Sequence, residues 1–307
     1  MDKKSIQKRG LKDGKPLSLS KFNWCSKTGK FSSDVDGLVI DFKSISNLTI
    51  NVCNNNTIDV GSNNTINAVN SNTIKAYSNN TINAYSNNTI NAGYSNTINA
   101  TYSNTINAGS NNTINVGNNN TINATYNNTI KVGKDCVIVR RDVFEVIQPA
   151  CGDTITIFPY GKKGYLTNGM YNGKPHIIAD GIVSEIINKK GNVYKVKNLG
   201  EHNLSWLIEN NGVYSHGSTL KQAKDDLVYK LSDRDTSMYL DYTLDTIVTK
   251  DAAIKMYMDI TGACGTGTKY FVNGLGKTKA NYTVREVIGI TTGQYNHSTF
   301  VDFFNKD

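Results

Sequence analysis

The chain has 307 residues, of which 38% are hydrophobic and 19% are charged. Both fractions are low for a globular protein, and Asn, Thr and Ser make up the difference. No stretch approaches the roughly 20 apolar residues that span a bilayer, which excludes transmembrane helices, and the scarcity of charge argues against a charge-rich disordered chain or a coiled coil.

Residues 1–30 hold nine basic side chains and two acidic ones, and therefore account for +7 of the formal net charge of +8. We expect a basic flexible arm here. Binding of nucleic acid by residues 1–30 is the alternative, and it is less favoured than a solvated arm. The first residues lack the apolar segment of a secretory signal. The five cysteines form no CxxC pair, which favours reduced thiols and a cytoplasmic protein.

An eight-residue repeat dominates the next hundred residues. From Thr49 to Thr129 a threonine recurs at every eighth position, usually within the pattern [S/N]-N-T-I-N-[A/V]. A period of eight fits no α-helix, and the alternation of Ile and Ala/Val with Thr and Asn is that of a strand. The pattern predicts a mainly β fold: a two-sheet β-solenoid of 8-residue half-coils and 16-residue coils. We expect Ile inside, Thr outside and the corner Asn side chains stacked along the rod.

Tyrosines at the corners of the repeat are candidates for an exposed aromatic binding row, although they are equally compatible with sequence drift on a solvent-facing turn. Two adjacent arginines follow the repeat and complete the set of candidate binding residues. The candidates are Tyr77, Tyr85, Tyr94, Tyr102, Tyr126, Arg140 and Arg141.

The flanking segments read differently. Residues 31–48 keep the strand alternation with larger residues and are expected to cap the first coil, so that the solenoid with its N-terminal cap spans residues 31–135. Residues 136–217 form a β-rich linker or cap domain, with a hairpin at Asn210-Asn211-Gly212. Residues 218–307 form a small helical C-terminal module, with helices starting after Thr219, Thr249 and Thr283.

The sequence offers little catalytic chemistry. Residues 271–278 end like a phosphate-binding loop but lack its first glycine, and a surface turn between helices is the better interpretation. Cys264 and His297 could form a nucleophile–base pair, but a lone Cys is more often a core residue. We therefore predict no catalytic residues, no metal site, no cofactor and no enzyme activity.

The octads resemble the half-repeats of bacterial ice-nucleation proteins, most closely at residues 92–97. A fuller resemblance is to uncharacterised octapeptide-repeat proteins of phages and prophages, carried by residues 135–147, 215–221, 260–264 and 294–295. This resemblance implies a phage origin and a recurrent C-terminal module, and it transfers no catalytic residue.

These observations lead us to expect a phage-encoded, non-enzymatic interaction protein. The solenoid would be a rigid scaffold or oligomerisation rod, and the C-terminal module would bind a host or phage macromolecule, for instance to antagonise a host defence system. A protein partner is favoured, a homo-oligomer is an option and a membrane partner is not expected. The expected location is the cytoplasm of the infected bacterium, with the virion as the alternative. A virion fibre or adhesin, an ice-binding protein and an enzyme of the C-terminal half are the alternative functions.

Overall fold

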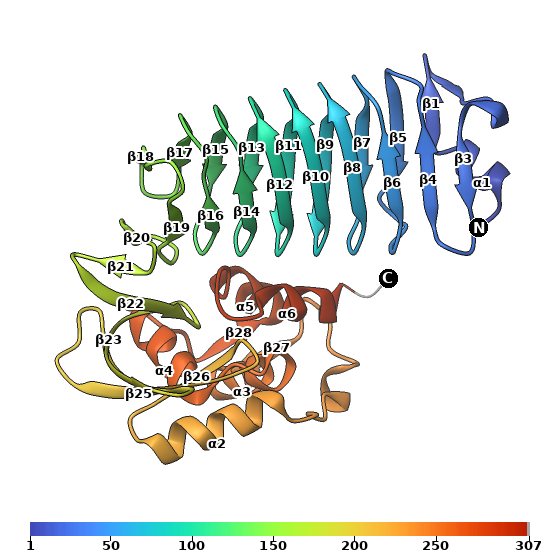
Figure 1. Cartoon of the computed structure of the whole chain (residues 1–307). Coiled ribbons are helices and arrows are strands. Elements are labelled where there is room, and N and C mark those ends of the chain that lie inside the picture. Colours follow the sequence, from blue (N-terminus) through green and yellow to red (C-terminus); the bar gives the residue numbers. More distant parts are fainter. Residues whose placement is uncertain (306–307) are drawn as a thin grey trace. The chain divides into compact units, whose positions relative to one another are not determined.

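In the computed structural model, which describes residues 1–305 apart from the side chain of residue 266, each octad forms one short strand (Figure 1). Successive strands alternate between two sheets, and each strand pairs in parallel with the strand two octads away, as in the register Thr81↔Thr97 and Ile82↔Ile98. The predicted two-sheet solenoid with 16-residue coils is confirmed. One sheet holds β6 (Thr49–Val52), β8 (Thr65–Asn70), β10 (Thr81–Ser86), β12 (Thr97–Tyr102), β14 (Thr113–Val116) and β16 (Thr129–Lys131). The other holds β7 (Thr57–Val60), β9 (Thr73–Ser78), β11 (Thr89–Tyr94), β13 (Thr105–Ala108) and β15 (Thr121–Ala124).

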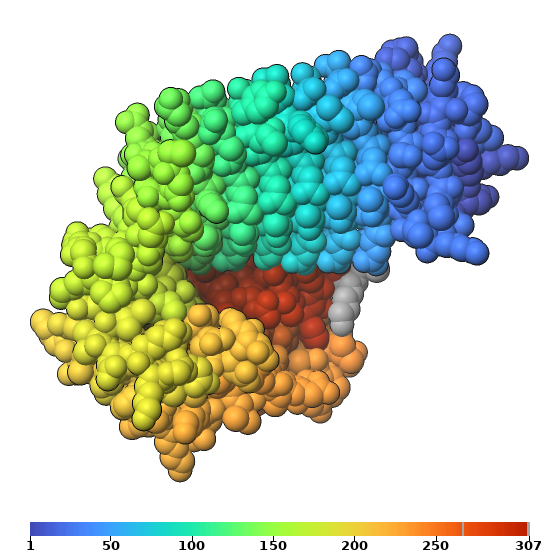
Figure 2. All heavy atoms as spheres, viewed as in Figure 1, coloured from blue at the N-terminus to red at the C-terminus, as the bar shows by residue number. Residues whose placement is uncertain are grey.

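The interior of the solenoid contains one Ile and one Ala or Val from each strand. Ile82 and Ile98 are fully buried, and Ala84 and Ala100 are 4% exposed. The Thr and Asn residues between them face outward because successive side chains of a strand point to opposite faces. In the space-filling view the coils lie side by side as parallel ridges that follow one another from the blue to the green part of the chain (Figure 2).

The same backbone geometry turns the chain at each corner of the repeat. The residue two before each Thr adopts a left-handed backbone, as at Asn79 (φ 55°) and Ser95 (φ 57°), which Asn tolerates better than most residues. The next residue is Leu48 at the first corner and a buried Asn at the others, and the Oδ1 of each Asn accepts a backbone N–H of the preceding coil, as Asn96 does from Asn80. The predicted stacking of corner Asn residues is confirmed. The buried series is Asn56, Asn64, Asn72, Asn80, Asn88, Asn96, Asn104, Asn112, Asn120 and Asn128.

Residues 1–43 form an ordered N-terminal cap, so the expectation of a flexible arm at 1–30 is wrong. Ile6, Leu17 and Phe22 are buried in the same core as the repeat. The sequence does not reveal this packing, because the segment is rich in charge and its three buried apolar residues follow no regular period. The elements are α1 (Lys3–Gln7), β1 (Gly10–Lys12), β2 (Lys15–Pro16), η1 (Leu19–Lys21), β3 (Asn23–Cys25), β4 (Lys30–Ser33) and β5 (Leu38–Phe42).

Antiparallel strands close the other end of the solenoid. β17 (Val137–Arg140) still pairs in parallel with β15, and β18 (Glu145–Ile147) pairs antiparallel with β17. β19 (Thr154–Ile157) pairs antiparallel with β16 and with β20 (Tyr165–Thr167). These strands cover the last coil, as an edge strand requires.

The chain divides into two compact units, Met1–Gly169 and Met170–Asp307. The boundary falls inside the segment 136–217. The second unit begins with an antiparallel sheet of β21 (Met170–Tyr171), β22 (Lys174–Ala179), β23 (Ile182–Lys190), β24 (Val193–Asn198), β25 (Leu204–Asn210) and β26 (Val213–Gly217). β25 and β26 form the predicted hairpin, with Asn210 opposite Val213.

Helices complete the second unit, and three of them start where the sequence predicts. The side chains of Thr219, Thr249 and Thr283 each cap the helix that follows. Among the described residues, no helix has both the length and the apolar character needed to cross a membrane. The remaining elements are α2 (Leu220–Leu231), η2 (Ser237–Tyr239), β27 (Ile247–Thr249), α3 (Lys250–Thr261), α4 (Gly265–Gly274), β28 (Asn281–Thr283), α5 (Val284–Ile290) and α6 (His297–Phe304).

Candidate functional site

The five candidate tyrosines do not form one row. Successive octads belong to opposite sheets, so only residues about sixteen apart share an edge of the solenoid. Tyr85 and Tyr102 lie near the ends of β10 and β12 on one edge and are 63% and 55% exposed. Tyr77, 65% exposed, and the half-buried Tyr94 belong to the other edge.

Tyr126 is not a surface residue. It is 7% exposed, and its ring packs edge-on against Tyr160 with centroids 5.2 Å apart. Its selection as a binding residue is therefore wrong. Near the end of the repeat, residues that follow the last coil cover the corner that would otherwise expose this ring.

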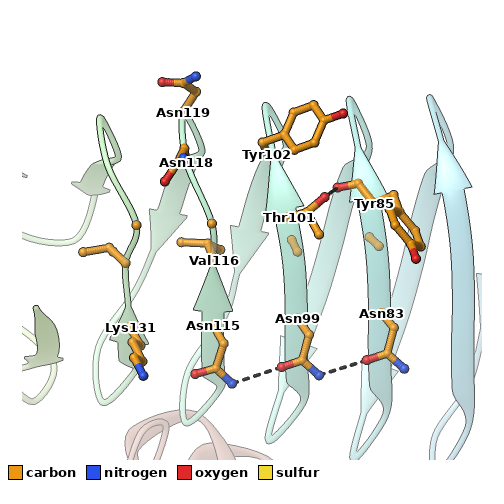
Figure 3. Close-up of a pocket in the computed structure, with 15 residues that line it drawn as sticks. Asn83, Tyr85, Asn99, Thr101, Tyr102, Asn115, Val116, Asn118, Asn119 and Lys131 are labelled. Atoms are coloured by element: carbon orange, nitrogen blue, oxygen red, sulfur yellow. Dashed lines mark hydrogen bonds between the residues drawn. The ribbon is translucent and has the colours of Figure 1, made fainter. Parts of the chain in front are cut away.

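Tyr85 and Tyr102 border a groove of about 820 Å³ on the sheet that contains β10, β12, β14 and β16 (Figure 3). Its lining combines the two tyrosines with Asn side chains of the outer face and with the exposed Lys131. The sequence pattern pointed to the two tyrosines, but not to the groove between them.

The groove exists because side chains shrink along one column of the solenoid. Positions sixteen residues apart carry Tyr85, Thr101, Gly117 and Gly133 in turn. A Cβ at Gly117 would lie 2.2 Å from the carbonyl oxygen of Thr101, so the packing of the coils allows only glycine there. The column consequently falls from a large ring to bare backbone within two coils.

A ladder of Asn amides runs along the floor of this face. Nδ2 of Asn115 donates to Oδ1 of Asn99 at 3.0 Å, and Nδ2 of Asn99 donates to Oδ1 of Asn83 at 2.9 Å (Figure 3). The ladder continues in the same direction through Asn67 to Asn51. All five amides therefore point the same way, and each keeps a second N–H and a second lone pair for another partner.

A second hollow, of about 280 Å³, lies on the other side of Tyr85. It shares Asn83 and Tyr85 with the first and extends to Ser32 and Asp34. Together the two hollows form a track, here called the Tyr85 track, which runs from Asp34 to Lys131. From Asn51 to Lys131 it spans five coil steps, or about 24 Å at the usual strand spacing.

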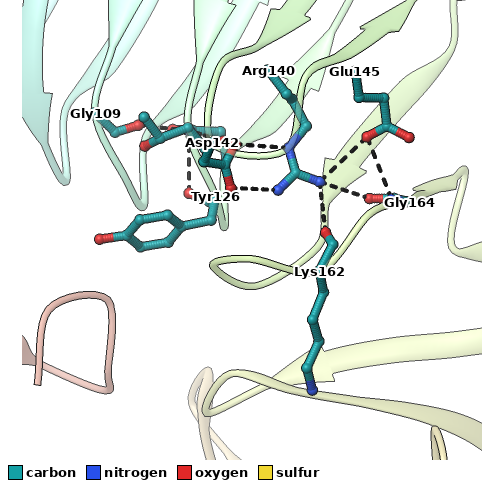
Figure 4. Close-up of polar contacts among 9 residues, drawn as sticks. Gly109, Tyr126, Arg140, Asp142, Glu145, Lys162 and Gly164 are labelled. Carbon is teal, nitrogen blue, oxygen red and sulfur yellow. Dashed lines mark hydrogen bonds and ion pairs between the residues drawn. The ribbon is translucent and has the colours of Figure 1, made fainter. Parts of the chain in front are cut away.

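Arg140 is a structural residue, so its selection as a binding residue is wrong. Its side chain is fully buried and bonds to Asp142 at 2.8 Å and to Glu145 at 3.4 Å (Figure 4). It also donates to the carbonyl oxygens of Lys162 and Gly164. These contacts fasten the turn between β17 and β18 to the loop before β20. Arg141, by contrast, is exposed.

The second unit contains a buried polar cluster that the sequence does not reveal. Oδ2 of Asp180 lies 2.6 Å from Nζ of Lys230, 3.7 Å from Nδ1 of His216 and 3.7 Å from Sγ of Cys264. Nζ of Lys230 also lies 4.1 Å from the ring centroid of Tyr295. The members come from β26, α2 and the turns before β23 and α4, and no motif links positions so far apart in the chain.

The cluster does not form an activated nucleophile. Burial raises the pKa of Cys264, and the Asp180 carboxylate raises it further. The thiol caps α4, where its Sγ accepts the N–H of Gly267 at 3.3 Å. A protonated thiol in a capping role lacks the thiolate that nucleophilic chemistry requires.

The other chemical candidates also have structural roles. Nδ1 of His297 lies 3.2 Å from Oγ1 of Thr291, and burial lowers the pKa of His297. Residues 271–274 belong to α4 rather than to a turn, which corrects the interpretation of the segment 271–278. Within residues 1–305, no three His, Cys, Asp or Glu side chains are grouped to hold a metal ion.

Comparisons with models of protein families, with curated proteins and with solved structures give no match for this chain.

Proposed function

We propose that this is a non-enzymatic interaction protein whose solenoid binds an extended segment of a partner protein along the Tyr85 track. The observation that carries the proposal is the position of Tyr85, a 63% exposed ring between two hollows on one continuous face. Tyrosine combines large apolar area with a polar tip and is enriched in protein interfaces.

The floor of the track supplies directional polar contacts. The unused N–H groups and lone pairs of the Asn ladder match the donors and acceptors of an extended main chain. The exposed Asp34 lies at one end of the track and the exposed Lys131 at the other. A bound segment would therefore be favoured when its basic side chains lie near Asp34 and its acidic ones near Lys131.

The rigidity of the solenoid also favours binding. The main chain and the corner Asn residues are bonded from coil to coil, so the track loses little conformational freedom when a partner binds. In this proposal the solenoid is the scaffold, and the second unit is free for a further macromolecule in the cytoplasm of an infected bacterium.

A random 12-residue peptide library displayed on phage and selected on the full chain tests the proposal. We expect the selected peptides, made synthetically, to bind at least tenfold more weakly to Tyr85→Ala, a loss of about 1.4 kcal/mol. Tyr77→Ala is the matched control, because Tyr77 has the same place in its octad and a similar exposure, 65%, on the other edge.

Charge reversal tests the direction of the bound segment. Lys131→Glu should weaken peptides that have an acidic end and should strengthen the same peptides with that end made basic. Failure to select any peptide, or equal affinity for the wild type and Tyr85→Ala, contradicts the proposal. Binding of oligosaccharides but no peptides, in a manner that depends on Tyr85, would reassign the track to glycans.

A further inference from the structure

The N-terminal cap concentrates the charge of the protein in a folded structure. Residues 1–43 carry ten basic and five acidic side chains, whereas the rest of the chain is nearly neutral. Because the cap packs on the core through Ile6, Leu17 and Phe22, these charges are held on a fixed surface. A flexible arm would dilute the same charges over a large volume.

Five of the exposed lysines of the cap lie in or beside different elements. One follows α1, one is in β2, one ends η1, one lies in the turn between β3 and β4, and one begins β4. Across residues 1–305, none of the five makes an ion pair with a carboxylate. They are Lys8, Lys15, Lys21, Lys27 and Lys30.

The acidic residues of the cap are engaged elsewhere. Oδ1 of Asp2 accepts the N–H of Ser5 at 2.8 Å and caps α1. Oδ1 of Asp36 accepts the N–H of Asn54 at 2.9 Å. Of these acidic residues of the cap, only Asp13 forms an ion pair with a lysine of the cap, Lys12 at 3.9 Å. The positive potential of the five lysines is therefore not cancelled by local pairing.

The aromatic residues of the cap serve its own packing. The rings of Phe22 and Phe31 are buried and stack with centroids 5.6 Å apart. The half-buried Trp24 donates its Nε1–H to the carbonyl oxygen of Met1 at 3.0 Å. With its aromatic rings engaged in this way, the cap resembles a site for phosphates more than one that inserts aromatic anchors between lipid headgroups.

We propose that the N-terminal cap binds the sugar–phosphate backbone of nucleic acid through Lys8, Lys15, Lys21, Lys27 and Lys30. Each lysine is a point charge on a flexible stem, which suits phosphate but reads no base sequence. Binding is driven by the release of counterions and is independent of nucleotide sequence. None of these five lysines lines the Tyr85 track, and the proposal does not depend on the function proposed for that track.

Fluorescence anisotropy of the full chain with a labelled 30-base-pair DNA of arbitrary sequence, from 50 to 300 mM salt, tests the proposal. We expect the slope of log affinity against log salt to fall by about 0.9 for each lysine removed that contacts a phosphate. The test variant is the triple substitution Lys8→Gln, Lys21→Gln and Lys27→Gln, with a second DNA of unrelated sequence to check independence of sequence.

The matched control changes the net charge equally at residues outside the cap. Lys190→Gln, Lys221→Gln and Lys224→Gln remove three exposed lysines of the second unit and should leave both affinity and slope unchanged. Absence of DNA binding at 50 mM salt, or an equal loss in the two triple variants, overturns the proposal. Sedimentation with phosphatidylserine vesicles that depends on the cap lysines, without DNA binding, would assign the cap to a membrane surface instead.

Discussion

Asn80 and Asn96 stand one coil apart, and the backbone N–H of Asn80 donates to Oδ1 of Asn96 at 2.9 Å. Nδ2 of Asn96 in turn donates to the carbonyl oxygens of Tyr77 at 3.0 Å and Tyr94 at 3.2 Å. One buried amide thus bonds to three main-chain groups at a corner. Backbone polar groups left unpaired away from water are costly, so this contact stabilises the turn of the solenoid.

Replacement of Asn96 should therefore be much more damaging than replacement of an outward Asn. We expect Asn96→Ala to lower the free energy of unfolding by about 2–4 kcal/mol, because it leaves the buried N–H of Asn80 without its acceptor and removes a donor from the carbonyl oxygens of Tyr77 and Tyr94. Asn99→Ala should cost less than about 1 kcal/mol, since water can replace the bonds of the outer ladder. Urea unfolding of the two variants measures the difference, and equal losses would contradict the capping role.

The period of the repeat accounts for how much of the solenoid could be predicted. An eight-residue repeat with Ile at a fixed place determines which side chains are buried, as at Ile82, and the small residue beside it, Ala84, sets how closely the two sheets approach. The N-terminal cap could not be predicted in this way. Its buried residues, such as Ile6 and Phe22, belong to no repeat and stand in a lysine-rich segment. Neither periodicity nor composition therefore identifies them as core residues.

The cap should be required for the stability of the solenoid. Phe22 is 3% exposed and stacks on Phe31, so we expect Phe22→Ala to cost about 3–5 kcal/mol. Deletion of residues 1–30 should lower the Tm markedly, because it uncovers β4 and Phe31. Leu19→Ala is the control, since Leu19 is 37% exposed and should change the Tm little. An unchanged Tm after the deletion would show that the cap is dispensable.

The candidate site was only partly predictable, for a geometric reason. Tyr85 and Tyr102 are visible in the sequence as corner tyrosines, but the groove beside them depends on Gly117 and Gly133, which lie two and three coils away from Tyr85. Arg140 looks like an exposed cation in the sequence. Its burial depends on the carbonyl groups of residues 162 and 164, which belong to a loop without a recognisable pattern.

The stability of the second unit should depend on pH through Asp180. Burial alone raises the pKa of Asp180, but the contacts with His216 and Lys230 outweigh burial and hold the pKa below its usual value of 3.8. A carboxylate with a depressed pKa stabilises the fold above the unfolded-state pKa, and this stability is lost as the pH falls through the folded-state value. We expect the free energy of unfolding of this unit to decrease below about pH 4.

Substitution isolates the contribution of Asp180 from those of other acids. At pH 7, Asp180→Asn should cost about 3–5 kcal/mol, because it leaves the Lys230 ammonium buried without its anion. The difference between wild type and Asp180→Asn should shrink as the pH is lowered below the usual carboxyl pKa of 3.8 and wild-type Asp180 becomes protonated. Chemical unfolding at a series of pH values measures this difference, with the exposed Asp225→Asn as control. A difference that does not change with pH would show that Asp180 contributes no charge-dependent stability.

Arg140 and Arg141 provide a neighbouring pair in which burial decides the outcome. Arg140→Met should lower the free energy of unfolding of the first unit by about 3–5 kcal/mol, because it leaves the Asp142 carboxylate, only 6% exposed, without its cation and removes a donor from the carbonyl oxygens of Lys162 and Gly164. Arg140→Lys should recover only part of this loss, since an ammonium cannot reproduce the forked contact with Asp142. Arg141→Met, at an exposed position, should change the stability by less than about 0.5 kcal/mol. Thermal and urea unfolding of the three variants measures these changes in stability. A loss of stability in Arg141→Met as large as that in Arg140→Met would show that local charge, and not the buried ion pair, stabilises the end of the solenoid.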